Sequence, residues 1–161
     1  MRKRHTVMTT QIALERPDTP DVAQLVYDLQ SYLEQFYPPE SQHGFSIDQL
    51  VAQQVDFFVA RIDGVAAGCC GVKFYDYDGG FGEIKRMYVP PTYRGRGLAK
   101  QLLAQVEAHT RAQGYTVLRL ETGIHQHEAL ALYEWFGFVL IPPFGEYTTD
   151  PLSICYEKKL T

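Results

Sequence analysis

The first third of the chain combines a β-rich stretch with two segments in which apolar residues recur at helical spacing. Residues 7–14 predict a strand. Thr19 is a suitable N-cap and Pro20 suits the first helical position, so we expect a helix to begin here. The apolar face of this helix consists of Val22, Leu25, Val26, Leu29, Leu33 and Phe36. Two prolines end it, and residues 46–53 predict a short second helix with a serine cap.

Strand patterns dominate the middle of the chain. Residues 55–62 and 65–75 are rich in β-branched and aromatic residues and predict two strands. The dipeptide Asp63-Gly64 between them is a strong signal for a hairpin turn. A third strand is expected to begin near Glu83, after a loose connection, and two prolines end it.

The last third of the chain predicts two further helices and three strands. Residues 98–113 and 126–137 have helical spacing of apolar residues, and each segment leads into a glycine that suits a helix end. Residues 115–121, 138–141 and 152–158 predict strands. The resulting order, β-α-α-β-β-β-α-β-α-β-β, indicates an α+β fold.

Length and composition fit a single domain over residues 1–161, because 45% of the residues are hydrophobic. No apolar run approaches the ~20 residues of a membrane helix, and the start of the chain lacks a signal-peptide core. The three cysteines are odd in number, and the neighbours Cys69 and Cys70 would face opposite sides of a strand. Free thiols in a reducing compartment follow, so we expect a cytoplasmic protein. The net charge of −4 argues against nucleic-acid binding.

The segment from Arg94 to Ala99 predicts an anion-binding turn. It follows a strand and precedes a helix, so the N–H groups at the helix start can bind a phosphate or pyrophosphate. Arg94 and Arg96 add positive charge. Gly95 and Gly97 allow the backbone to approach the phosphates without a Cβ atom in the way.

Two well-known phosphate motifs do not fit this turn. No Gly-Lys-Ser/Thr follows a first glycine, and Lys100 occupies the third glycine position of the dinucleotide fingerprint. The pattern Arg94-x-x-Gly97-x-Ala99 instead resembles the acyl-CoA signature of the GNAT superfamily of N-acetyltransferases. The resemblance implies that the whole turn contacts the cofactor, namely Arg94, Gly95, Arg96, Gly97, Leu98 and Ala99.

A second segment, Ala129–Phe138, resembles the other cofactor segment of the same superfamily, Ala-x-x-Leu/Phe-Tyr-x-x-x-Gly-Phe. The predicted element order is also the GNAT order. The resemblance spans essentially the whole chain and implies a mixed central sheet of about seven strands flanked by about four helices. The stretches Pro38–Ser41, Glu121–Gly123, Phe144–Tyr147 and Asp150–Ser153 resemble a bacterial GNAT subgroup.

The resemblance implies acetyl-CoA as co-substrate. Met87, Tyr88 and Val89 would lie along the pantetheine arm, and the backbone of Met87 and Val89 would pair with its amides like an extra strand. A backbone N–H in this strand can also polarise the thioester carbonyl. Many family members carry asparagine at the position of Gln126, where it contacts the pantetheine arm. Glutamine keeps the amide but adds a methylene, so the chain departs from the family pattern at this contact.

Acetyl transfer to an amine requires a base, because a free alkylamine with a pKa near ~10.4 is almost fully protonated at neutral pH. By resemblance, Glu83 matches the glutamate that some GNAT enzymes use as base through water. The alternative is a solvated strand-end carboxylate, paired with Lys85 or Arg119. Tyr133 matches the general acid that protonates the leaving thiolate, since a phenol is a donor at neutral pH. For Tyr133 the alternative is core packing.

Other candidates lie in regions that line the acceptor pocket in GNAT folds. Further candidate bases are Glu121, His43 and Glu40. The candidate substrate-binding residues are Tyr32, Tyr37, Glu40, His43, Glu121 and Tyr147, and aromatic packing is the alternative for the tyrosines. His125 and His127 are two residues apart without accompanying ligands, so no metal site is expected.

These observations predict an N-acetyltransferase that moves an acetyl group from acetyl-CoA to a primary amine of a small molecule, by direct attack in a ternary complex. One alternative is acetylation of a protein N-terminus or lysine. Another is a non-catalytic acyl-CoA-binding module, which could dispense with Tyr133 and Glu83. We expect no nucleic-acid or membrane partner and a monomer or homodimer.

Overall fold

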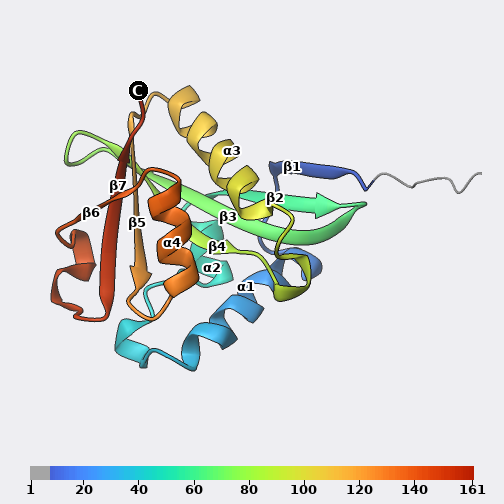
Figure 1. The fold of residues 1–161 in the computed structure, drawn as a ribbon, viewed down its shortest axis with the longest axis horizontal. Coiled ribbons are helices and arrows are strands. Elements are labelled where there is room, and N and C mark those ends of the chain that lie inside the picture. The colour runs from blue at the N-terminus through green and yellow to red at the C-terminus, as the bar shows by residue number, and fades with distance from the viewer. Residues whose placement is uncertain (1–7) are drawn as a thin grey trace, which may run out of the picture.

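A single mixed sheet forms the centre of the protein, whose computed structural model describes residues 8–161 (Figure 1). Seven strands follow the order β1-β2-β3-β4-β5-β7-β6, and all neighbours are antiparallel except β4 and β5. The strands are β1 Thr10–Leu14, β2 Asp56–Ile62, β3 Val65–Tyr75, β4 Phe81–Tyr88, β5 Val117–Gly123, β6 Val139–Ile141 and β7 Ser153–Lys159. The helices are α1 Pro20–Glu34, α2 Ile47–Ala52, α3 Leu98–Ala112 and α4 His127–Trp135.

The observed order of helices and strands confirms the predicted α+β order. Most boundaries differ from the expected ones by one or two residues. The first strand begins at Thr10 in the structure, and residue 7 of the predicted strand lies outside the described part. Within residues 8–161, none of the helices is both long and apolar enough to cross a membrane.

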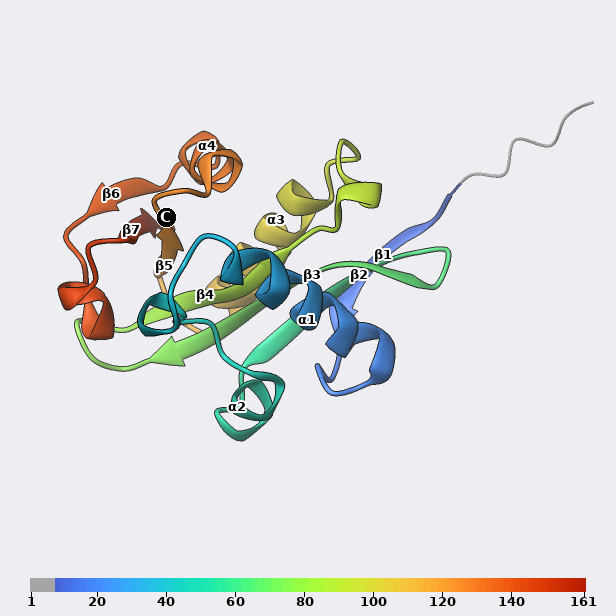
Figure 2. The ribbon, with the colours of Figure 1, turned by 90° about the horizontal axis from the view of Figure 1, so that it is seen from below.

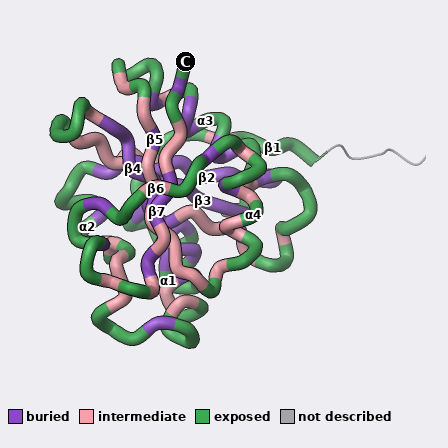
Figure 3. The backbone as a smooth tube through the Cα atoms, turned by 60° about the vertical axis from the view of Figure 1, so that its left-hand side comes forward, coloured by how far each residue is buried: buried purple, intermediate pink, exposed green. Residues whose placement is uncertain are grey.

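The helices cover both faces of the sheet, with α1 and α2 on one face and α3 and α4 on the other (Figure 2). The central strands carry many of the buried residues (Figure 3). Leu102 of α3 shares an apolar core with Cys70, while Val26 of α1 packs in a second core with Cys69. The adjacent cysteines therefore face opposite sides of β3, as predicted. Both are buried and free, as is Cys155.

The start of α1 differs from the expected capping arrangement. Thr19 occupies the N-cap position, and its carbonyl accepts the Ala23 N–H (2.8 Å), but its side chain makes no hydrogen bond to the helix backbone. Its hydroxyl donates to the Asp21 carboxylate (3.2 Å), which also accepts the Val22 N–H (2.9 Å). The prediction of a threonine cap was therefore wrong in this detail, because the carboxylate in the first turn takes over the role. At α2, Ser46 forms the expected cap, a reciprocal capping box with Gln49.

The parallel strands β4 and β5 separate halfway along their length. They pair only between Gly82–Ile84 and Leu118–Leu120, although both strands continue. Beyond this point β4 contains a β-bulge against β3, and Arg86 in the bulge has a positive φ of 56°. Bulges bend a strand and increase its local twist. The separation leaves a cleft between the two strands, and the candidate site lies in this cleft.

Candidate active site

Two adjoining pockets occupy the cleft between β4 and β5. The outer channel has a volume of about 490 Å³ and extends from Val89 and Arg94 to the start of α4. The inner pocket has a volume of about 140 Å³ and contains Glu83 and Glu121. Six residues line both spaces: Leu29, Leu33, Met87, Gln126, Ala129 and Tyr133. The two spaces therefore meet at Tyr133, which comes from α4.

The outer channel reaches the N-terminus of α3. Gly95 and Gly97 precede this helix with φ values of 78° and 76°, a backbone region that favours glycine. The first helical hydrogen bond is donated by the Gln101 N–H to the Gly97 carbonyl (3.1 Å). The N–H groups of the three residues between them have no acceptor within the helix. They form an anion site of the kind that the sequence predicts.

Not every residue of this turn lines the channel. Arg94 and Ala99 line the channel, together with Tyr88, the last residue of β4, and Val89, which follows the strand. The Arg94 Nε donates to the Val89 carbonyl (3.0 Å), which fixes the start of its guanidinium at the channel wall. Gly95, Arg96, Gly97 and Leu98 lie next to the channel without lining it, and Leu98 is buried in the core.

Glu83 belongs to a buried polar network in the inner pocket. Its side chain is buried, and its Oε1 lies 2.7 Å from the Lys85 Nζ. The Tyr147 hydroxyl donates to the same Oε1 (2.5 Å) and accepts from the Lys85 ammonium (2.8 Å). The alternative of a solvated carboxylate is therefore wrong in its exposure, because Glu83 is buried, but the pairing with Lys85 that it included is confirmed. Arg119 pairs instead with Glu157 (2.9 Å).

Glu121 lies at the same end of the cleft, on β5, and has fewer partners. The Ser153 hydroxyl donates to its Oε1 (2.9 Å). Burial raises the pKa of Glu121 above that of an ordinary carboxyl group, although this hydrogen bond and the neighbouring His43 and Lys85 oppose the shift. Glu121 is consequently the carboxylate of the pocket with enhanced proton affinity.

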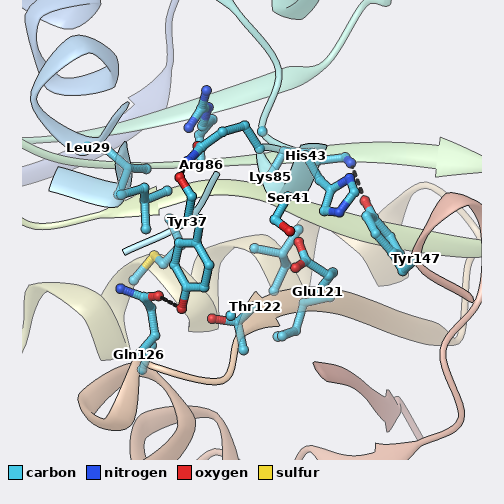
Figure 4. A pocket seen from close by; sticks show the side chains of 18 of the residues that line it. Leu29, Tyr37, Ser41, His43, Lys85, Arg86, Glu121, Thr122, Gln126 and Tyr147 are labelled. Atoms are coloured by element: carbon cyan, nitrogen blue, oxygen red, sulfur yellow. Dashed lines mark hydrogen bonds between the residues drawn. The ribbon is translucent and has the colours of Figure 1, made fainter. Parts of the chain in front are cut away.

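His43 lines the inner pocket beside Tyr147 (Figure 4), and Asp150 contacts His43. The His43 Nε2 lies 2.6 Å from the Asp150 Oδ2, and the imidazole packs edge-on against the Tyr147 ring. Burial opposes ionisation of Asp150, but hydrogen bonds from His43 and neighbouring groups outweigh it and lower its pKa. The predicted candidate Glu40 is exposed and lines neither pocket.

Tyr133 separates the outer channel from the inner pocket. Its side chain is buried, and within residues 8–161 its hydroxyl has no hydrogen-bond partner. Burial raises the pKa of Tyr133, and the nearby Cys70 and Glu121 add to the shift. The phenol therefore remains protonated at neutral pH, with its donor uncommitted to the rest of the described chain.

Comparison with known proteins decides the family. The profile of the Acetyltransferase (GNAT) family matches residues 23–138, more than half of the chain. The chain belongs to the GNAT family. An "IAA acetyltransferase" of Azospirillum brasilense is 44% identical over 149 residues, which cover 92% of this chain and 97% of that protein.

Solved structures agree with this assignment. A Klebsiella pneumoniae protein described as an acyl-CoA N-acyltransferase is 35% identical, with a TM-score of 0.79 and coverage of 95% of this chain and 99% of that one. The PaiA N-acetyltransferase of Thermoplasma acidophilum, solved in complex with coenzyme A, is 21% identical with a TM-score of 0.75. The alignment covers 94% of this chain and 99% of the T. acidophilum protein, and the two proteins share the same fold. This GNAT protein is an acyltransferase.

One contact of this GNAT protein was not foreseen from its sequence. Tyr37 follows α1, and its side chain reaches across the pocket to the loop between β5 and α4 (Figure 4). Its hydroxyl donates to the Gln126 Oε1 and accepts the His125 N–H (3.0 Å). A Cβ at Gly123 would overlap the Tyr37 ring. Glycine at this position therefore permits the contact.

Three further residues of the inner pocket and its surroundings were not predicted as site residues. Asp150 and Ser153 hold His43 and Glu121 from segments more than 30 residues away. Arg86 lines the inner pocket from the bulge of β4, where a regular strand would direct its side chain elsewhere.

The predicted candidate Tyr32 lines only the outer channel. Among residues 8–161 there is no cluster of three potential metal ligands.

Proposed function

We propose that this protein transfers an acetyl group from acetyl-CoA to a primary amine of a small molecule, by direct attack of the amine in a ternary complex. One observation carries the proposal. A channel that begins at the anion site of α3 opens, at Tyr133, into a small pocket with two carboxylates. The coenzyme A bound to the T. acidophilum relative supports the choice of donor. We treat residues 1–161 as one acetyltransferase domain.

The outer channel fits the shape and chemistry of an acyl-CoA. Phosphate groups would bind the free N–H groups at the start of α3, beside Arg94. The pantetheine arm would lie along β4 beyond Ile84, where β5 no longer pairs with it. The backbone of Met87 and Val89 can then bind the arm as an added strand. The thioester would reach Tyr133, where the channel meets the inner pocket.

The inner pocket supplies the acid and the base for acyl transfer. The amine nitrogen bonds to the acetyl carbon, its proton passes to the Glu121 carboxylate, and the carbon–sulfur bond breaks. The departing thiolate takes the proton of the Tyr133 hydroxyl. Glu83, which matches the glutamate used by relatives, is the second candidate base. We favour Glu121 because Lys85 and Tyr147 already engage Glu83.

Replacing Glu121 with glutamine is expected to lower kcat by about 10²–10⁴-fold and to remove the acidic limb of the pH–rate profile. In the wild-type protein the pKa of Glu121 is raised in the folded state. Its contribution to stability is therefore present below the unfolded-state pKa and is lost as pH rises through the folded-state pKa. Since glutamine carries no charge to desolvate, the variant should melt at a higher temperature at neutral pH.

Glu83→Gln is the matched control, measured by the same rate and melting assays. It leaves Lys85 buried without its carboxylate, so we expect lower stability and a smaller loss of rate than in Glu121→Gln. A large loss of kcat in Glu83→Gln alongside a fully active Glu121→Gln would assign the base to Glu83.

Replacing Tyr37 with phenylalanine should weaken acetyl-CoA binding. The Tyr37 hydroxyl holds the oxygen of the Gln126 side chain, so the amide nitrogen of Gln126 remains available to the channel. Loss of one hydrogen bond of ordinary strength corresponds to about a fivefold increase in Kd. Calorimetric titration with acetyl-CoA measures the change, and an unchanged Kd would show that Gln126 needs no orientation by Tyr37.

Two alternatives, acetylation of a protein N-terminus or lysine and a non-catalytic acyl-CoA-binding module, make different demands on the inner pocket. A volume of about 140 Å³ favours a small acceptor over a polypeptide segment. A panel of small amines and of peptides, incubated with acetyl-CoA while free thiol is measured, separates these substrates. A module without catalysis would bind acetyl-CoA but release no thiol with either class. We propose a monomer or homodimer, which gel filtration with light scattering tests.

A further inference from the structure

Arg86 is the basic residue of the inner pocket without an acidic partner. Its side chain is buried, and only 8% of the residue is exposed. Its Nε donates to the Phe45 carbonyl (2.8 Å) and its Nη2 to the Gln30 Oε1 (2.7 Å), both of which are neutral. Throughout residues 8–161, no carboxylate lies within 4.0 Å of this guanidinium, whereas Lys85 and His43 each have one.

A buried guanidinium without a counter-ion is unusual, because buried charges are normally paired. The position is also conformationally costly, since Arg86 has a positive φ within the β-bulge. Backbone strain of this kind collects at ligand sites, where the surrounding structure maintains it. Burial and strain together indicate that an anion from outside the chain completes the environment of Arg86.

We propose that Arg86 binds a carboxylate of the acceptor, so that the preferred acceptor is an amino acid or another amine that carries a carboxylate. This inference rests on the proposed N-acetyltransferase function and names its substrate class. Figure 4 shows Arg86 and Glu121 at different sides of one pocket, on β4 and β5 respectively. In this proposal one small molecule places its amine near Glu121 and its carboxylate at Arg86, since both residues line the same pocket.

The guanidinium has donor capacity left for this ligand. Its Nη1 makes no hydrogen bond with any group of residues 8–161. In that part of the chain no side-chain nitrogen or oxygen is both sealed from solvent and unpartnered, so Nη1 keeps some solvent exposure, and Arg86 is one of the residues that line the inner pocket. Gly44 packs directly on the guanidinium, where a Cβ would overlap it. The contacts to Gly44, Phe45 and Gln30 hold the side chain in one orientation before the ligand binds.

The test compares pairs of acceptors that differ only at the carboxylate. Phenylalanine, its amide and phenethylamine form one such series, and β-alanine with its amide forms another. With the wild-type protein, kcat/KM should favour the carboxylate member by about 10–100-fold, as expected for a hydrogen bond between charged groups. In Arg86→Gln this ratio should fall to about one, and Arg86→Lys should show an intermediate ratio. Each ratio of kcat/KM values is measured within one protein preparation. Unfolded protein therefore lowers both values equally and leaves the ratio unchanged.

Gln30→Ala serves as the control for a purely structural role of Arg86. It removes one neutral partner of the guanidinium but leaves the charge and the contacts to Gly44 and Phe45, so the preference for carboxylates should weaken but persist. Acetyl-CoA affinity and melting temperature of each variant establish that the pocket is folded. If Arg86→Gln does not fold, Arg86→Lys and the wild-type comparison of acid with amide decide the matter.

The outcomes distinguish this inference from the proposed function. If no amine in the panel is acetylated, the proposed function fails. If amines are acetylated without preference for the carboxylate member, the assignment of Arg86 is overturned and the proposed function stands. A preference that persists unchanged in Arg86→Gln also overturns it, because another group would then bind the carboxylate.

Discussion

Tyr133→Phe is expected to reduce turnover by about 10²–10⁴-fold while acetyl-CoA affinity changes little. The substitution removes one hydroxyl and keeps the ring that packs against Phe138. If this hydroxyl protonates the leaving thiolate, its loss affects the transition state and leaves ground-state binding nearly intact. Steady-state kinetics with calorimetric measurement of acetyl-CoA binding, on one preparation, separate the two effects.

Tyr156→Phe is the matched control for this experiment. Tyr156 is buried in the same core cluster, and its hydroxyl donates to Glu134 (3.0 Å) outside both pockets. Its loss should cost about 1 kcal/mol of stability, the usual value of one hydrogen bond, without slowing acetyl transfer. If Tyr133→Phe behaves like this control, its role is packing, and the thiolate leaves with a proton from another donor.

The second large effect is expected at the turn before α3, where Gly97→Val should abolish measurable acetyl-CoA binding. Gly97 has a left-handed backbone, which a β-branched residue adopts only with strain of about 1–3 kcal/mol. The nearest atom to a Cβ at this position is 3.9 Å away, so backbone strain outweighs crowding as the cause. The turn should relax, and the free N–H groups at the start of α3 then lose their alignment.

Gly64→Val is the control for this experiment, because it introduces the same kind of backbone strain at a position away from the candidate site. Gly64 lies in the hairpin between β2 and β3 with φ of 83° and no atom within 4 Å of a Cβ. Both variants should lose similar stability in thermal melts, but only Gly97→Val should lose acetyl-CoA binding in calorimetry. Unchanged affinity in Gly97→Val would place the phosphate site elsewhere.

The features that the sequence predicts correctly are those set by neighbouring residues. The Asp63-Gly64 turn, the prolines that end elements and the apolar spacing of α3 act over a few residues, so the element order was predictable. The turn before α3 also connects a strand to a helix, as predicted. The GNAT resemblance rested on this turn and on the Ala129–Phe138 segment, which together line the channel.

The features that escaped prediction depend on contacts between distant segments. Glu83 and Tyr147 are 64 residues apart, and nothing near Glu83 in the sequence reveals that it is buried or that Tyr147 contacts it, although its pairing with Lys85 was one of the alternatives. The bulge that directs Arg86 into the pocket has no glycine or proline to mark it, because an arginine occupies the positive φ position. The roles of His43 and Glu121 likewise depend on Asp150 and Ser153, which reach them only in the folded chain.

The most direct test of the account measures acetyl transfer itself. Purified protein is incubated with acetyl-CoA and a panel of small primary amines, while free thiol is titrated and the products are analysed by mass spectrometry. We expect amine-dependent thiol release, with one mono-acetylated product formed for each thiol. Tight binding of acetyl-CoA without thiol release for any small amine, or acetylation of peptides alone, would contradict it.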